Sequence, residues 1–205
     1  MTPKFLYFDL GRVLVNFSVE RMLDQMAAVS GITADAVRHA VFTGGLMQQH
    51  EAGRLSTPEF YEAFCAATGA RPAAERLVEA TADIFEMNLP MLPVVAQLQE
   101  AGYPMGILSN TCDTHWDHCF AHYRIVNRGF QVYALSQRIG ALKPDAAIFR
   151  AAAQLAGHRP EDIFFVDDIL GHVEGAKAVG FDAVQYTTAG ALADALRQRG
   201  LRFNY

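Results

Sequence analysis

The stretch Phe5-Leu6-Tyr7-Phe8-Asp9 decides the fold, because an uninterrupted apolar run is followed at once by a carboxylate. A short run that is apolar at every position is typical of a parallel strand covered on both faces. Four more short apolar runs follow, at 105–108, 132–135, 163–166 and 183–186, and helical patterns that stop at glycines separate the later ones. Strands that alternate with helices indicate βαβ units. The sequence therefore predicts an α/β fold with a doubly wound, Rossmann-like parallel sheet.

Residues 16–88 break this alternation, because they show helical spacing and no convincing strand. Within them, Ser56-Thr57-Pro58-Glu59 is typical of a helix start, with proline in the first turn. We therefore expect an all-helical cap domain over 16–88. It would be inserted into a Rossmann-like catalytic core domain made of 1–15 and 89–205.

The composition excludes several classes of partner. The 205 residues include 17 basic and 22 acidic ones, which give a formal net charge of −5, and 51% are hydrophobic. This is ordinary globular usage, and the absence of a basic excess argues against nucleic-acid or membrane binding. We expect a monomer or homodimer that acts on a small molecule.

The cysteines and the amino-terminal residues indicate in which cellular compartment the protein is expected. Three cysteines, at 65, 112 and 119, are an odd number and argue against a disulfide framework. The first apolar run is shorter than the roughly 7–15 residues of a signal peptide or the ~18 of a membrane helix. We therefore expect a cytoplasmic protein.

Polar side chains follow the ends of the predicted strands. Asp9 follows the first run, Ser109 and Asn110 the second, and the pair Asp167-Asp168 the fourth, while Lys143 comes some way after the third. Each alone is explained by a turn or a helix cap. Four such coincidences at the ligand-binding edge of a doubly wound sheet favour a site instead.

This set of residues indicates magnesium-assisted phosphoryl transfer. Asp9 and Asp168 offer the hard oxygen ligands that Mg²⁺ takes, and two adjacent carboxylates would repel each other without a cation. Lys143 and the Ser109 hydroxyl are suited to phosphate oxygens. A carboxylate nucleophile that forms an aspartyl-phosphate divides one difficult hydrolysis into two easier steps.

Another cluster has the residue types of a zinc site but the wrong span. Cys112, His115, Cys119 and His122 would extend over about 15 Å of a helix, which is too far for one tetrahedral ion. We expect these side chains to pack beneath the second motif.

The motifs, taken in order, resemble those of a known superfamily. They are Phe8-Asp9-Leu10-Gly11-Arg12-Val13-Leu14, Leu108-Ser109-Asn110, Leu142-Lys143-Pro144-Asp145 and Phe165-Val166-Asp167-Asp168. They resemble the four motifs of the haloacid dehalogenase (HAD) superfamily, and the helical insertion resembles its C1 cap. The stretches Gln49-His50-Glu51-Ala52-Gly53 and Leu135-Ser136-Gln137 are similar to the bacterial α-D-glucose-1-phosphate phosphatase group. The resemblance implies a Mg²⁺-dependent phosphatase of a small phosphorylated metabolite, with a sugar phosphate as the best single guess.

The resemblance also implies roles at the metal. Asp9 would be both the nucleophile and a metal ligand, and the Gly11 backbone carbonyl would be a second ligand. Asp168 would bind the Mg²⁺ ion directly, whereas Asp167 would reach it through water.

Further residues are expected to hold the substrate. The resemblance implies that Ser109 and the Asn110 amide bind the phosphate and that Lys143 bridges phosphate and nucleophile in catalysis. In the cap, His50 and Glu51 lie close to a Gly-Gly turn that can face an active site. We expect both to contact substrate.

Gly11 departs from the pattern of most phosphatases in the superfamily, which carry a second aspartate there as general acid and base. We expect slow turnover limited by breakdown of the phosphoenzyme, unless water or a cap residue such as His50 or Glu51 takes the role. Metal-independent 2-haloacid dehalogenases also lack this aspartate and are the enzymatic alternative. The second alternative is a non-catalytic protein that binds a phosphorylated ligand or a partner protein.

Overall fold

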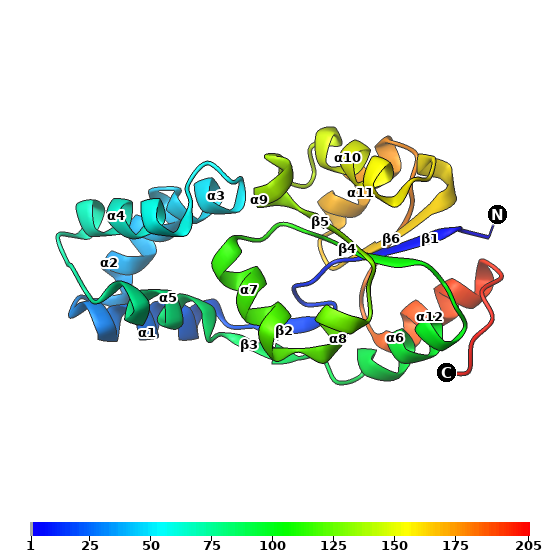
Figure 1. Ribbon diagram of the computed structural model, residues 1–205, viewed down its shortest axis with the longest axis horizontal. Helices are drawn as coiled ribbons and strands as arrows, with labels where there is room; N and C mark the ends of the chain where they lie inside the picture. The colour runs from blue at the N-terminus through cyan, green and yellow to red at the C-terminus, as the bar shows by residue number, and fades with distance from the viewer. Residues whose placement is uncertain (1) are drawn as a thin grey trace.

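A five-stranded parallel sheet forms the centre of the larger part of the molecule (Figure 1). The computed structural model describes residues 2–205. The strands run in the order β5-β4-β1-β6-β7, with Phe8 of β1 level with Ile107 of β4 and Val166 of β6. The predicted α/β fold with a Rossmann-like parallel sheet is confirmed. The strands are β1 (Phe5–Phe8), β4 (Met105–Ser109), β5 (Val132–Leu135), β6 (Ile163–Asp167) and β7 (Asp182–Gln185).

Helices cover both faces of this sheet, which explains why β1 and the first four residues of β6 are all apolar or aromatic. Successive strand residues point to opposite faces, so Tyr7 packs under one layer of helices and Phe8 under the other. Helices α10 and α11 lie on the first side, and α6 and α12 lie on the second (Figure 1). The helices are α6 (Met91–Glu100), α7 (Asp113–His122), α8 (Arg124–Arg128), α9 (Ser136–Ile139), α10 (Ala146–Ala156), the 3-10 turn η2 (Pro160–Asp162), α11 (Leu170–Ala178) and α12 (Ala189–Gln198).

A separate group of helices lies beyond the carboxyl edge of the sheet (Figure 1). Its helix α4 begins at the predicted place, where Ser56 and Glu59 form a reciprocal capping box. The element η1 is a π-helix, a form that often occurs at functional sites. The elements are α1 (Val19–Ser30), α2 (Ala34–Arg38), η1 (His39–Thr43), α3 (Leu46–Glu51), α4 (Thr57–Thr68) and α5 (Ala74–Ala82).

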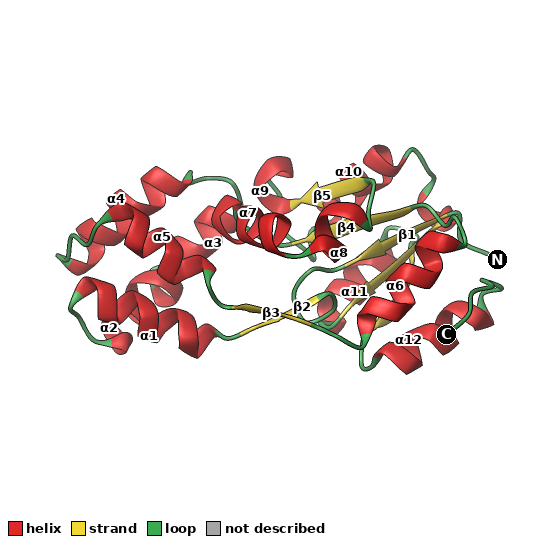
Figure 2. Cartoon of the chain, turned by 60° about the horizontal axis from the view of Figure 1, so that its bottom comes forward, coloured by secondary structure: helices red, strands yellow, loops and turns green. Residues whose placement is uncertain are grey.

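Two short strands connect this cap to the core, and the sequence did not indicate them. β2 (Val15–Phe17) pairs antiparallel with β3 (Phe85–Met87), so that both crossings of the chain lie side by side (Figure 2). Three residues are too few to establish a period, and the partner strand lies about 70 residues away in the sequence. The domain limits at 15/16 and 88/89 fall inside and just after this ribbon, and they stay a prediction.

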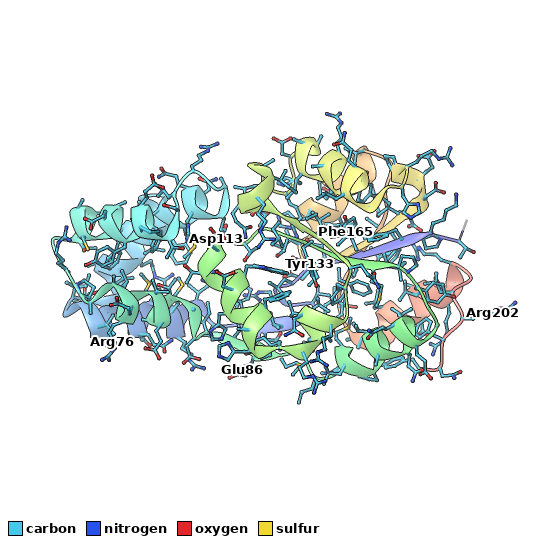
Figure 3. All side chains as sticks on the ribbon, viewed as in Figure 1. Arg76, Glu86, Asp113, Tyr133, Phe165 and Arg202 are labelled. Carbon is cyan, nitrogen blue, oxygen red and sulfur yellow. The ribbon has the colours of Figure 1, made fainter. Side chains whose placement is uncertain are left out.

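Side chains fill the space between the sheet and its helices (Figure 3). Phe165 of β6 is buried in the core, whereas Arg76 of α5 extends from the outer surface of the cap. Among residues 2–205, no helix is long and apolar enough to cross a membrane.

Candidate active site

Lys143 joins two carboxylates at the carboxyl edge of the sheet. Its Nζ lies 2.5 Å from Asp167 Oδ2 and 3.0 Å from Asp9 Oδ1, and it donates to the Leu108 carbonyl oxygen at 3.1 Å. Asp9 follows β1, Asp167 ends β6, and all three charged side chains are buried. Buried charges are tolerated when they are paired and hydrogen-bonded. This cluster is therefore the electrostatic centre of the sheet edge.

Asp9 is ionised at neutral pH although it is buried. Burial raises its pKa to about 6, the positive charge of Lys143 acts in the opposite direction, and the negative charge of Asp167 adds to the rise. Oδ1 also accepts a hydrogen bond from the Leu10 amide at 2.7 Å. A carboxylate that is ionised yet only partly stabilised has the properties of a nucleophile.

Asp167 is held more tightly than Asp9. Its oxygens lie 3.0 and 3.1 Å from His172 Nδ1, and one accepts a hydrogen bond from the Ile169 amide at 2.8 Å. Burial raises the pKa of Asp167, but His172 and Lys143 outweigh this effect and bring the pKa to about 2. Its oxygens are engaged by the protein, so Asp167 is placed to orient Lys143.

The loop after β4 is fixed to the backbone of Lys143. Asn110 Oδ1 accepts a hydrogen bond from the Lys143 amide at 2.8 Å, and Asn110 Nδ2 donates to the Lys143 carbonyl at 3.1 Å. Ser109, the last residue of β4, lies close enough to Asp9 to lower the pKa of that carboxyl group, and its hydroxyl donates to the Asn110 carbonyl oxygen at 3.4 Å. The Asn110 side chain therefore positions Lys143, a role that the sequence did not suggest.

Asp168 faces a second opening beside the catalytic loop. Its partly exposed carboxylate lies 3.9 Å from Arg12 Nε, and both residues line that opening. Burial, reinforced by the charge of Asp167, raises the pKa of Asp168. A nearby cation would stabilise the ionised form of a carboxyl group whose pKa is raised in this way.

The sequence predicts Asp9, Ser109, Lys143 and Asp168 in one pocket. The structure brings the first three together and places Asp168 in the neighbouring opening. Consecutive residues at the end of a strand point in opposite directions. Asp167 therefore takes the place beside Lys143, and Asp168 lines the neighbouring opening with Arg12.

The donor set at this edge fits Mg²⁺. Three carboxylates, of Asp9, Asp167 and Asp168, share the edge with one buried ammonium group, that of Lys143. Ligand atoms of Asp9, Asp167 and His172 lie within 4.8 Å of one another. Excess negative charge carried by oxygen donors is what a hard divalent cation requires. Lys143 and His172 both engage Asp167, whereas Lys143 alone engages Asp9 and Asp168 is partly exposed, so Asp9 and Asp168 stay the predicted direct ligands.

Gly11, two residues after Asp9, lies against the ring of Phe17 in β2. A Cβ at this position would lie 2.9 Å from Cε1 of Phe17 in β2. The Arg12 guanidinium lies 5.2 Å from the centre of the Phe17 ring. The ring thus occupies the space beside Gly11, and this loop presents no proton-transferring group there.

A cavity of about 100 Å³ lies between the cap and the core. Gly11, Ser109 and Asn110 contribute to its catalytic side, so the cavity adjoins the Asp9–Lys143 cluster. Its other lining residues come from both domains and from the β2–β3 ribbon. They are Leu10, Phe17, Val19, Met22, Phe42, Met47, Glu51, Ile84, Phe85, Thr111 and His115.

Glu51, the last residue of α3, brings a carboxyl group to this cavity. Burial raises its pKa to about 7, the negative charge of Asp9 adds to the rise, and Lys143 opposes it. A carboxyl group that titrates near neutrality is able both to donate and to accept a proton. The position of Glu51 is compatible with the expected substrate contact.

His50 is not among the residues that line this cavity. Its Nδ1 lies 2.8 Å from the Leu55 carbonyl oxygen, its Nε2 lies 3.4 Å from Thr114 Oγ1, and its ring stacks on Phe60. Consecutive residues of a helix point about 100° apart, so Glu51 and its neighbour cannot share one target. His50 joins α3 to α4 and α7, and its expected contact with substrate stays a prediction.

Ser136 fastens the cap to the core beside the site. Its buried hydroxyl donates to the Glu51 backbone carbonyl at 2.6 Å and accepts from the Thr111 amide at 2.9 Å. A Cβ on Gly53 would lie 2.2 Å from the Gln137 carbonyl oxygen, so the two backbones approach closely here. Asp113, at the start of α7, marks this side of the junction in Figure 3. The position of Glu51 depends on this contact.

Three residues of the site were missed by the sequence analysis. His172 lies five residues after Asp167, a spacing that could have suggested a contact between a strand end and the following helix. Phe17 and His115 reach the site only through the β2–β3 ribbon and α7, and no local pattern indicated this. Of the four side chains with zinc-ligand residue types, Cys112, His115 and Cys119 are buried, as expected, whereas His122 is exposed.

Known proteins share both the sequence pattern and the fold. Residues 8–180 match the family described as haloacid dehalogenase-like hydrolase. The chain is 25% identical over 189 residues to D-ribitol-5-phosphate phosphatase of Bacteroides thetaiotaomicron, covering 89% of this chain and 91% of that protein. It is 30% identical over 98 residues to glyceraldehyde 3-phosphate phosphatase of Methanopyrus kandleri, covering 46% of this chain and 41% of that protein.

A solved structure adds information about ligands. A HAD family enzyme from Bacteroides thetaiotaomicron, in complex with magnesium and inorganic phosphate, superposes with a TM-score of 0.80 and 25% sequence identity. The match covers 91% of this chain and 95% of that one.

Proposed function

The chain belongs to the haloacid dehalogenase-like hydrolase family, and from that premise we propose that it hydrolyses a small phosphomonoester through an aspartyl-phosphate on Asp9. The protein is an enzyme of the phosphatase type, and Mg²⁺ is its cofactor. The observation that carries the proposal is the contact of Lys143 with both Asp9 and Asp167. The narrower likeness to the glucose-1-phosphate phosphatase group stays a prediction.

In the first step, the Asp9 carboxylate attacks phosphorus. Lys143, held by Asp167 and by the Asn110 loop, neutralises charge on the transferring phosphoryl group. The Ser109 hydroxyl and the Asn110 amide bind its oxygens. Because phosphoryl transfer depends mainly on positioning and electrostatics, this fixed arrangement supplies most of what the chemistry needs.

The Mg²⁺ ion would be held by Asp9, Asp168 and the Gly11 carbonyl oxygen. Asp167 would contact the ion through water. Bound Mg²⁺ neutralises negative charge on the phosphoryl oxygens. On the protein side, Asp167 keeps Lys143 in place, and Arg12 lies 3.9 Å from Asp168.

Glu51 takes the proton-transfer role that is missing at position 11. It lines the same cavity as Gly11, whereas His50, the other cap candidate, has both ring nitrogens engaged elsewhere. A protonated Glu51 would donate to the leaving oxygen, and the resulting carboxylate would accept a proton from the water that opens the phosphoaspartate.

The dehalogenase alternative uses the same nucleophile without metal. The carboxylate pair Asp167-Asp168 and the phosphatase names of the relatives favour phosphate. The non-catalytic alternative is set aside, because the chain belongs to a hydrolase family.

The decisive experiment measures phosphate release from a panel of small phosphomonoesters, including D-ribitol 5-phosphate, with Mg²⁺ and with EDTA. We expect release that EDTA abolishes and added Mg²⁺ restores. Turnover that is unchanged in EDTA, or halide release from 2-haloacids without metal, would contradict the proposal.

A further inference from the structure

The cavity changes its chemical character with distance from the catalytic loop. Ser109 and Asn110 make its phosphate end polar. Beyond them, most of the wall is apolar, contributed by Phe17, Val19, Met22, Phe42, Met47 and Phe85. A hydroxyl group that leaves water for such a wall loses hydrogen bonds that the wall cannot replace.

Thr111 also lines the cavity, but its hydroxyl already donates to the Cys112 carbonyl oxygen at 3.4 Å. Two other polar side chains interrupt the apolar wall, and they limit which polar groups of a ligand can find a partner there. One is Glu51, to which we assign proton transfer. The other is His115, which is buried and whose Nε2 has no hydrogen-bond partner among the described residues. Burial lowers the pKa of His115 to about 4, so the ring is neutral at pH 7. His115, which lines the cavity, thus has a hydrogen-bonding atom that no described residue uses.

Phe42 marks the cap side of the cavity. It lies in the π-helix η1 and remains 40% exposed, although most large apolar side chains of the chain are buried. Aromatic surface exposed at a cavity is stabilised when an apolar ligand covers it. Met22 and Met47 add flexible apolar surface that can adapt to shape.

We propose that the leaving group of the substrate is a compact, mostly apolar alcohol with at most one further polar group, which contacts His115. This rests on the proposed phosphatase function. At about 100 Å³ the cavity is small for a ligand site, which favours a compact leaving group. The expected sugar phosphate would place more hydroxyl groups against the wall than Glu51 and His115 can satisfy.

The test compares substrates of similar size and opposite polarity. n-Butyl phosphate and glycerol 3-phosphate differ mainly in hydroxyl groups, and D-ribitol 5-phosphate serves as a longer polyol. We expect kcat/KM for n-butyl phosphate to exceed that for either polyol by at least about tenfold, a usual size of discrimination in an apolar pocket. The leaving oxygen of a polyol is the more acidic, so chemistry alone would give the reverse order.

A polar substitution in the cavity wall should weaken the preference for n-butyl phosphate over the polyol phosphates. Met47→Gln keeps the length of the side chain and adds an amide, and we expect it to reduce the n-butyl preference at least about threefold. Leu155→Gln makes the same kind of change on α10, at a side chain that is 53% exposed and outside the cavity, and should leave the preference unchanged. If Met47→Gln fails to fold, Val19→Thr adds a hydroxyl group to the wall at nearly constant volume.

The outcomes separate this inference from the proposed function. Equal or better turnover of the polyols, with the Mg²⁺ dependence intact, would overturn the apolar leaving group and leave the phosphatase in place. No turnover of any ester would contradict the phosphatase. In that case, binding of n-butylphosphonate is compared with that of inorganic phosphate by calorimetry. Tighter phosphonate binding that Met47→Gln weakens would support the apolar wall, and equal binding would overturn it.

Discussion

The ring of Phe17 occupies the space into which a side chain at Gly11 would extend, since a Cβ there would lie 2.9 Å from Phe17 Cε1. Position 11 therefore supplies no acid–base group in this chain. A proton donor must then approach from the cap, and Glu51 is the carboxyl group that lines the cavity from that direction.

The first prediction concerns Glu51→Gln. Positioned acid–base catalysis is worth roughly 10²–10⁴ in rate, so turnover of alkyl phosphates should fall by about that factor. The phosphoenzyme, with labelled phosphate on Asp9, should accumulate in single-turnover experiments, because its hydrolysis loses the general base. Formation of this intermediate from p-nitrophenyl phosphate, whose leaving group needs no proton, should be much less affected.

Glu79→Gln, on the exposed surface of α5, is the matched control and should behave like the parent. Equal losses on both substrates in Glu51→Gln, with no accumulation of phosphoenzyme, would assign Glu51 a purely structural part. If the parent itself accumulates phosphoenzyme and turns over slowly, Glu51 does not replace the missing group at position 11.

Asp9→Asn should retain the fold and lose activity. Removing a nucleophile typically costs a factor of about 10³ or more, which phosphate release would measure. The melting temperature should not fall, because burial and the charge of Asp167 already disfavour the Asp9 carboxylate. Asp24→Asn, on the exposed face of α1, controls for the change of charge. Near-normal activity of Asp9→Asn would mean that another residue is the nucleophile.

Lys143→Met should destabilise the protein as well as inactivate it. Loss of the ammonium group leaves the Asp9 and Asp167 carboxylates buried without a partner, which costs about 3–5 kcal/mol of unfolding free energy. Urea denaturation in EDTA would measure this loss. The double variant Lys143→Met/Asp167→Asn should recover part of it. An unchanged unfolding free energy in the single variant would show that the ion cluster contributes little to stability.

His115 gives a pH dependence with a defined sign. Burial holds its folded-state pKa at about 4, below the ordinary 6.5, so between these values the unfolded chain binds a proton that the folded chain does not. The unfolding free energy should therefore fall as the pH drops from 6.5 to 4, by up to about 3 kcal/mol from this group. His115→Gln should remove that component, and His39→Gln, an exposed change, should not. Parallel pH profiles for the parent and His115→Gln would contradict the assignment.

Local sequence patterns were sufficient for the sheet but not for the whole site. The apolar run at Phe5–Phe8 indicated a buried parallel strand, and the position of Asp9 at its end followed. Which of Asp167 and Asp168 would meet Lys143 depended on the direction of two adjacent side chains, which composition does not reveal. His50 and Glu51 are neighbours in sequence, and only the packing of α3 against α4 and α7 separates their surroundings.

The β2–β3 ribbon has a consequence for how such a protein changes over generations. Residue 15 pairs with residue 87, so the inserted segment leaves and re-enters the core at nearly the same point. An insertion whose ends lie together can be lengthened, shortened or exchanged without disturbing the strands that hold Asp9 and Lys143. The ribbon itself supplies Phe17 and Phe85 to the cavity wall. A transplanted cap would therefore inherit part of its selectivity from the connection through which it is attached.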